Sequence, residues 1–248
     1  MSAALAAVSL IPGLAIGSFL NVVAARLPEK RSVVSPGSAC GACGTPVRWY
    51  DNIPLVSYAV LRGRCRSCGV RFGLLYPAVE LVTALLVAAS FWAFGLSVRA
   101  FVAAFFCVCL VAVSATDLRA RIIPNVIVVP ATVIVLVAMT VSDPSIQWVA
   151  GALGASGFLL AAAIAYPSGM GLGDVKLAAL MGAALGWYVP IAMLAGMVFA
   201  LVPSIVLLAR HGAAARKMGI PFGPFLALGS VLALFAGEAV ADAYLGLF

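Results

Sequence analysis

The sequence predicts an all-α polytopic membrane protein, with about eight transmembrane helices and a cytoplasmic zinc-knuckle loop. Composition is the first reason: of 248 residues, 65% are hydrophobic and only 9% are charged. A soluble domain of this size carries about 25% charged residues. The second reason is that the apolar residues gather in runs long enough to cross the roughly 30 Å hydrocarbon core of a bilayer. The third is a pair of Cys-x-x-Cys motifs in the one long polar segment.

Eight apolar runs of helical length follow one another along the chain. They cover residues 3–25, 74–96, 100–116, 126–141, 146–166, 175–189, 191–209 and 225–247. No basic residue precedes the first run, so we expect a retained span rather than a cleaved signal peptide. Only Pro190 separates the sixth and seventh runs, which could therefore form one broken or re-entrant element.

The basic residues predict the orientation of these spans. With eight spans, every one of the 15 basic residues except Arg99 falls on the same side. Basic loops are retained in the cytoplasm, so this side is expected to be cytoplasmic and both termini external. We therefore divide the chain into a first span (1–25), a cytoplasmic cysteine-rich loop (26–73) and a multi-span membrane domain (74–248).

The loop carries the motifs Cys40-x-x-Cys43-Gly and Cys65-x-x-Cys68-Gly, with 21 residues between them. Four thiolates on two tight turns suit a tetrahedral Zn²⁺ that staples the loop, because no position is left open for catalysis. A cytoplasmic location disfavours structural disulfides, although a redox pair or plain thiols remain alternatives. Cys107 and Cys109 lie within an apolar run and are interpreted as small buried hydrophobes.

The loop is also strongly basic, with eight Lys and Arg residues against Glu29 and Asp51. Juxtamembrane basic segments are attracted to anionic lipid headgroups, and Trp49 and Tyr50 suit the membrane interface. No base-reading motif accompanies the charge, so we expect membrane lipids as partners and no nucleic acid.

Two carboxylates are candidates for one catalytic site. Asp117 closes the third span and Asp174 opens the sixth, so the topology puts both at the cytoplasmic edge of the membrane. An acid inside a membrane span costs about 2.5–3.5 kcal/mol, which makes it a functional candidate. Two neighbouring carboxylates in a low-dielectric site share one proton. One can then activate water while the other polarises a peptide carbonyl.

Other interpretations of these residues remain open. Asp174 could be the N-cap of its helix, and Asp117 could pair with a neighbouring arginine. Intramembrane acids also serve proton-coupled transporters, although these two lie at one edge rather than at the midplane. A structural assembly platform with inert acids is a further alternative. Glu80, near the same edge, could be an interfacial acid paired with a loop arginine.

The stretch around Asp174 reads Gly169-Met-Gly171-Leu-Gly173-Asp174-Val-Lys176. Its glycines allow another chain to approach the backbone closely, so Gly171 and Gly173 are expected to receive an extended substrate. Lys176 is interpreted as a snorkelling residue. The single histidine, His211, and the lack of a Gly-x-Ser-x-Gly motif leave aspartyl catalysis as the peptide-bond chemistry.

Several longer strings carry a resemblance. They are IGSFLNVVAARLP, the two CxxC motifs, DNIPLVSYAVLRGRCRSCG, YPAVE, TDLRARIIPN, GMGLGDVKL and IPFGPFLALG. Over residues 16–229, and in the same order, they resemble the bacterial type IV prepilin peptidases, which are GxGD-type intramembrane aspartyl proteases.

The resemblance implies an activity and a set of site residues. Members of this family cleave the short basic leader of prepilins and pseudopilins at the cytoplasmic face of the bacterial plasma membrane, after a glycine. Full-length members also methylate the new N-terminus with S-adenosylmethionine. The catalytic aspartates match Asp117 and Asp174, and Glu80 falls in a motif associated with methylation. The cysteine loop, which minimal protease-only relatives lack, favours the bifunctional form over a protease-only member.

Overall fold

A computed structural model describes residues 2–167, 170–212 and 219–246 of the chain. Gly169 of the glycine-rich stretch and the basic residues Arg216 and Lys217 lie outside the described residues. Within these ranges the structure is helical, and pairing between extended segments is limited to two isolated bridges in the loop. The chain forms two compact units, Met1–Arg119 and Ala120–Phe248.

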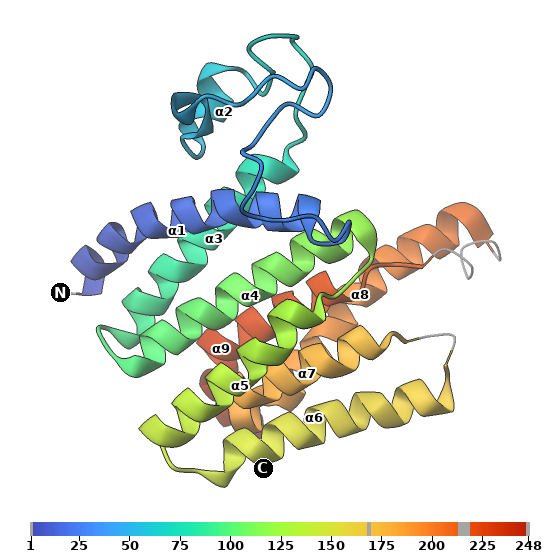
Figure 1. The fold of residues 1–248 in the computed structure, drawn as a ribbon. Helices are drawn as coiled ribbons and strands as arrows, with labels where there is room; N and C mark the ends of the chain where they lie inside the picture. Colours follow the sequence, from blue (N-terminus) through green and yellow to red (C-terminus); the bar gives the residue numbers. More distant parts are fainter. Residues whose placement is uncertain (1, 168–169, 213–218, 247–248) are drawn as a thin grey trace. The chain divides into compact units, whose positions relative to one another are not determined.

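The first unit contains three long helices and the cysteine loop. The long helices are α1 (Ser2–Arg26), α3 (Leu75–Phe94) and α4 (Val98–Ala120), and the loop holds the short helices η1 (Trp49–Asn52) and α2 (Val56–Val60). Helices α1 and α3 lie side by side in Figure 1. Their backbones approach closely because Gly13 faces Ala84 and Gly17 faces Glu80, where an added Cβ would lie 2.7 Å from the opposing Cα. Small residues spaced by four are a common basis of helix association in membranes.

The second unit contains the remaining long helices. They are α5 (Asn125–Ser142), α6 (Ile146–Ala165), α7 (Leu172–Leu185), α8 (Val189–His211) and α9 (Gly223–Leu245), with the 3₁₀ turn η2 (Gly186–Tyr188) between α7 and α8. Helices α6 and α7 cross at Gly151 and Gly182, and a Cβ on Gly182 would lie 2.1 Å from the carbonyl oxygen of Gly151. Glycine is therefore required on this face of α7.

The predicted helices are confirmed, and their ends lie within four residues of the ends of the apolar runs, with the largest differences at α4 and α7. In the described part of the chain, seven helical segments are long and apolar enough to cross a membrane, and one of them is the 40-residue segment Leu172–His211. Within that segment α7 ends at Gly186, whose φ of 55° closes the helix in a left-handed conformation. Helix α8 then runs back along the unit (Figure 1). The 14 residues of α7 extend only about 21 Å, less than the hydrocarbon core.

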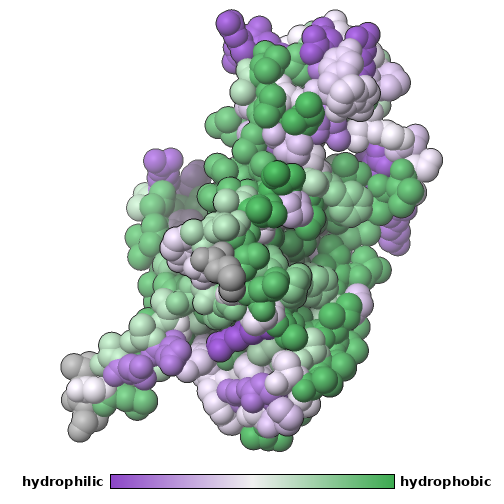
Figure 2. Space-filling model, turned by 90° about the vertical axis from the view of Figure 1, so that its left-hand side faces the viewer, coloured by the Kyte–Doolittle hydropathy of each residue, from purple (hydrophilic) through white to green (hydrophobic). Residues whose placement is uncertain are grey.

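Polar and apolar surfaces are distributed unevenly. Figure 2 shows hydrophilic residues gathered at the top of the view, over the cysteine loop, while hydrophobic residues cover much of the surface of the helices. Many of the exposed side chains on the helices are large and apolar, such as Leu85, Val133 and Leu153. Because water does not favour such a surface, this pattern agrees with a multi-pass membrane protein.

Candidate active site and metal centre

Asp117 lies near the end of α4, which carries it as its twentieth residue. That position is about 28 Å from the start of the helix, close to the thickness of the hydrocarbon core. The side chain is buried, with 6% of its surface exposed. Neighbouring Thr116 is also buried and donates to the carbonyl oxygens of Ala112 and Val113, so its hydroxyl is satisfied within the helix.

Asp174 lies in the first turn of α7 and is half-buried. The helix begins at Leu172 and its N-cap is Gly171, so the alternative that Asp174 is the N-cap is wrong. An acidic residue is favourable in a first turn because the unpaired N–H groups there carry partial positive charge. Asp117 and Asp174 belong to different units.

The two glycines beside Asp174 have different surroundings. A Cβ on Gly173 would lie 2.9 Å from the Cβ of Ile123, so this glycine is required by packing against the segment before α5. A Cβ on Gly171 would make only ordinary contacts, with the Asp174 Oδ2 at 3.5 Å and the Gly173 nitrogen at 3.9 Å. Gly171 is also exposed. Of the two predicted substrate-loop glycines, Gly171 is therefore the one whose open side adjoins the acid.

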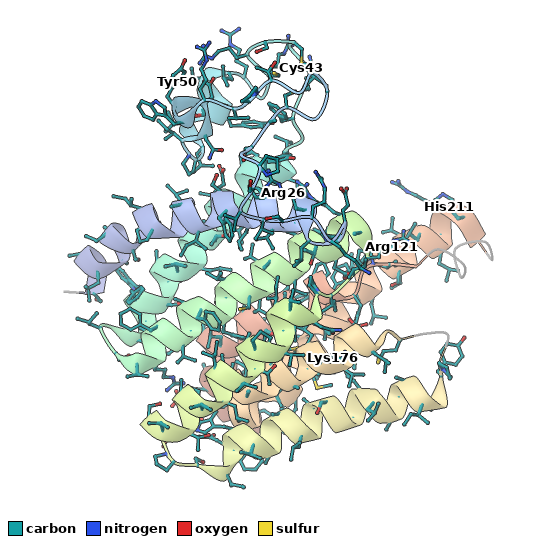
Figure 3. All side chains as sticks on the ribbon, in the orientation of Figure 1. Arg26, Cys43, Tyr50, Arg121, Lys176 and His211 are labelled. Carbon is teal, nitrogen blue, oxygen red and sulfur yellow. The ribbon has the colours of Figure 1, made fainter. Side chains whose placement is uncertain are left out.

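Lys176 connects the start of α7 to the start of α5. Its Nζ donates to the Asn125 side-chain oxygen at 2.9 Å. Figure 3 shows Lys176 among the helices of the second unit. The lysine is therefore held by a specific partner 51 residues away in sequence, rather than only snorkelling to the interface. Ile123 and Lys176 together fix the backbone that presents Asp174.

The four loop cysteines converge on one point. Their Sγ atoms all lie within 4.8 Å of one another, with Cys40 and Cys68 3.8 Å apart and Cys43 and Cys65 4.0 Å apart. A tetrahedral zinc with Zn–S bonds of about 2.3 Å requires ligand sulfurs about 3.8 Å apart. A disulfide would require about 2.05 Å, and all of these cysteines are free. The cluster can hold a metal ion.

Both knuckles have the same local structure. In each, the N–H of the glycine after the second cysteine donates to the carbonyl of the first cysteine, at 2.8 Å for Gly44 and 3.0 Å for Gly69. These glycines adopt φ values of 70° and 71°, which favour glycine. The predicted role of the Cys-x-x-Cys-Gly motif in forming tight turns is confirmed.

The thiols differ in acidity. The pKa of Cys43 is lowered to about 6, chiefly by hydrogen bonding with the Thr45 side chain, 3.2 Å away, and with the Thr45 backbone. Backbone hydrogen bonds from Cys68 and Ser67 lower the pKa of Cys65. A lowered pKa favours the thiolate, which is the form that binds metal.

A polar cluster surrounds the second knuckle. Arg66, between Cys65 and Cys68, forms a bidentate ion pair with Asp51, and the shorter of the contacts is 2.6 Å. The Arg66 guanidinium also lies over the Tyr50 ring, 5.6 Å from its centroid. Figure 3 shows Tyr50 and Cys43 in this part of the loop. Trp49, in contrast, is 81% exposed.

Glu80 lies in the second turn of α3 and is buried. Its Oε2 accepts a hydrogen bond from the backbone N–H of Leu55 at 2.8 Å. The partner is thus the backbone of the loop rather than one of its arginines.

Sequence reasoning missed Leu55, Ile123 and Asn125, because the role of each depends on one contact with a residue distant in sequence. The four-residue spacing of Gly13 and Gly17 was a signal for close helix packing that the analysis of apolar runs did not use.

The cysteine loop with its flanking helices and the segment that carries the two aspartates match two known sequence families. Residues 11–94 match the Bacterial Peptidase A24 N-terminal domain, and residues 104–205 match the Type IV leader peptidase family. The first range contains the cysteine cluster and Glu80, and the second contains both Asp117 and Asp174. The chain belongs to the type IV leader peptidase family.

Relatives match over nearly the whole chain. It is 37% identical to a prepilin leader peptidase/N-methyltransferase of Bacillus subtilis, over 94% of this chain and 95% of the relative. It is 34% identical to the protein of the same name in Pseudomonas aeruginosa, over 96% of this chain and 92% of the relative. A Myxococcus xanthus protein of that name is 39% identical over 82% of this chain and 64% of the relative. No solved structure matches.

Proposed function

We propose that the protein cleaves the leader peptide of type IV prepilin or pseudopilin-like substrates and N-methylates the new N-terminus. The observation that carries this proposal is that the peptidase family match covers both intramembrane aspartates. The third acid in that range, Asp143, lies in the turn between α5 and α6, where its carboxylate accepts a weak hydrogen bond from Gln147. Asp117 and Asp174 are therefore the candidates for an aspartate pair.

Cleavage would use the two carboxyl groups in opposite protonation states. The ionised group takes a proton from water, and the water oxygen attacks the carbonyl carbon of the scissile bond. The protonated group donates a hydrogen bond to the carbonyl oxygen as it gains negative charge. The C–N bond then breaks, and the leaving amine takes up a proton from a carboxyl group. Gly171, beside Asp174 and open to the surface, is proposed to receive the substrate backbone.

The orientation follows from the charges. With the basic loops in the cytoplasm, both termini are external, and the site faces the cytoplasm of the bacterial plasma membrane. A prepilin has an apolar helix that remains in the bilayer. A site at the membrane edge reaches the leader junction without extracting that helix.

Two cofactors are proposed, and the described residues fit them differently. The four cysteines match zinc in ligand type and spacing, so Cys40, Cys43, Cys65 and Cys68 would hold a structural ion. S-adenosylmethionine would supply the methyl group. Glu80, the candidate for binding it, is buried and already accepts an N–H. This setting fits a structural contact with the loop better than a direct contact with that molecule.

Anionic lipid is proposed as a further partner, because the basic loop would repel a basic leader. Lipid headgroups between the two would remove this repulsion. We expect cleavage in vesicles with anionic lipid to be about tenfold faster than in neutral vesicles, an effect that salt weakens. Equal rates in the two kinds of vesicle would contradict this idea.

The proposed activity can be tested with purified protein, a prepilin substrate and S-adenosylmethionine. Mass spectrometry of the product should show cleavage after a glycine and one added methyl group on the new N-terminus. Cleavage without methylation would indicate a protease-only enzyme. An intact substrate would contradict the proposal.

A further inference from the structure

We propose that Glu80 is a positioning residue, which holds the cysteine loop on α3 through the N–H of Leu55 and thereby supports methylation but not cleavage. The proposal rests on the function proposed above and assigns a role to one of its residues. It follows from the disagreement between Glu80's engaged carboxylate and a role as a ligand for the methyl donor.

Glu80, the hydrogen-bond acceptor, lies on a part of α3 that packs closely against α1. Glu80 is 9% exposed and lies on the part of α3 that packs against Gly17 of α1. A Cβ on Gly17 would lie 2.7 Å from the Glu80 Cα, so the two backbones are in direct contact there. One helical turn earlier on α3, the carbonyl of Tyr76 accepts a hydrogen bond from the Asn21 side chain at 3.0 Å. Helix α3 is thus fixed by α1 where Glu80 accepts the Leu55 N–H.

The donor is in an unfavourable backbone conformation. Leu55 has a φ of 59°, although it is not glycine. Side chains other than glycine are disfavoured at positive φ, so such a residue persists only where its surroundings hold it. The hydrogen bond from its N–H to the Oε2 of the buried Glu80, 2.8 Å long, is one interaction that holds it in this conformation.

Leu55 belongs to a turn that is tied together internally. The Ser57 hydroxyl donates to the carbonyl of Tyr50 at 2.9 Å and accepts from the N–H of Ile53 at 3.0 Å. Ser57 is buried. Residues 50–57 therefore move as one piece, and holding Leu55 holds all of them.

This turn is also joined to the metal centre. Asp51 forms the bidentate ion pair with Arg66, which stands within the Cys65–Cys68 knuckle. A continuous series of contacts therefore runs from the cysteine cluster through Asp51 and the residue 50–57 turn to Glu80. The carboxylate fixes the position of the knuckles over the end of α3.

The consequence for activity follows from the two family ranges. The loop and Glu80 lie within residues 11–94, whereas both aspartates lie within residues 104–205, which match the peptidase family. Loss of the Leu55–Glu80 contact should therefore displace the loop while leaving the aspartates unchanged. Positioning errors of about 1 Å can reduce a reaction rate by about a hundredfold.

Two substitutions separate positioning from a direct role of the charge. Glu80→Gln removes the charge but keeps a carbonyl oxygen at the same reach. Glu80→Asp keeps the charge but is one methylene shorter and loses the contact. We expect E80Q to methylate within about twofold of the wild type and E80D to methylate about tenfold more slowly. Both should cleave normally and retain the same zinc content.

Hydrogen exchange measures the Leu55–Glu80 contact independently of activity. The amides of residues 50–57 should exchange slowly in the wild type and E80Q, and faster in E80D. Leu55→Gly, which keeps the N–H and suits a positive φ, should retain slow exchange and methylation. The proposal is overturned if E80Q loses methylation while E80D keeps it, or if exchange in E80D equals that of the wild type. A wild-type protein that neither cleaves nor methylates would contradict the proposed function, while the exchange data would still test the contact.

Discussion

The cysteine loop and the membrane helices are held together by different interactions. In the loop, positions are fixed by polar contacts: the thiol cluster, the Arg66–Asp51 pair and the Leu55–Glu80 bond. In the helices, positions are fixed by the close approach of small residues, for example of Gly182 and Gly151. A carboxylate in the loop can therefore be explained by structure. Asp174 lies in α7, which crosses α6 at Gly182, and Asp117 is buried in α4, which contains no glycine. Both acids are proposed as catalytic residues because the peptidase family match covers them.

Removing a zinc ligand should have the largest effect, because it should abolish methylation in the loop region without affecting cleavage by the membrane helices. We expect Cys40→Ser to lose most of the bound zinc, because a structural site depends on all four ligands, and to lose methylation with it. Leader cleavage should continue. Metal analysis and mass spectrometry of the product check this.

Cys107→Ser provides the matched control. Cys107 is buried within α4, outside the thiol cluster, so this variant should keep its zinc. Full zinc content in Cys40→Ser would remove the proposed metal site.

The thiols of the metal-free loop should react at very different rates. Cys43 and Cys68 are both exposed, but the pKa of Cys43 is about 6 and that of Cys68 about 11. The thiolate forms as pH rises through the pKa, so at pH 7 Cys43 is largely thiolate and Cys68 is not. We expect Cys43 to be alkylated at least about tenfold faster.

Peptide mapping after brief treatment with iodoacetamide would measure the two rates. Lowering the pH to about 5 should slow Cys43 strongly, because it then becomes protonated. Equal labelling of Cys43 and Cys68 at neutral pH would contradict the described hydrogen bonding of Cys43 with Thr45.

The two glycines beside Asp174 should respond differently to the same methyl group. Gly173→Ala forces a Cβ against Ile123 and should lower the free energy of unfolding by about 1–3 kcal/mol. Gly171→Ala makes only ordinary van der Waals contacts and should lower the free energy of unfolding less. Its methyl group adjoins the Asp174 carboxylate, so we expect cleavage to slow by about tenfold.

Thermal unfolding and initial cleavage rates distinguish these effects. Gly154→Ala is a suitable control, since a Cβ there meets open space and lies on α6. If Gly171→Ala and Gly154→Ala cleave equally fast, Gly171 does not receive the substrate.

Sequence alone predicted the features that depend on composition and local spacing. The apolar runs located the long helices, and the Cys-x-x-Cys-Gly spacing predicted both knuckles, because each turn closes through its own backbone. Contacts between distant segments could not be predicted. Nothing local indicates that Glu80 reaches Leu55, or that Gly173 is required by Ile123. The start of α7 was also missed by three residues, which made Asp174 a candidate N-cap although Gly171 has that position.

The central claim is the proposal that cleavage needs Asp117 and Asp174 together. Cleavage rates of Asp117→Asn, Asp174→Asn and the double variant test it most directly, with folding checked by thermal unfolding. Residues that act together are not additive. Each single variant should therefore abolish cleavage, and the double variant should be no slower than either. Substantial cleavage by a single variant, or losses that multiply in the double variant, would contradict the claim.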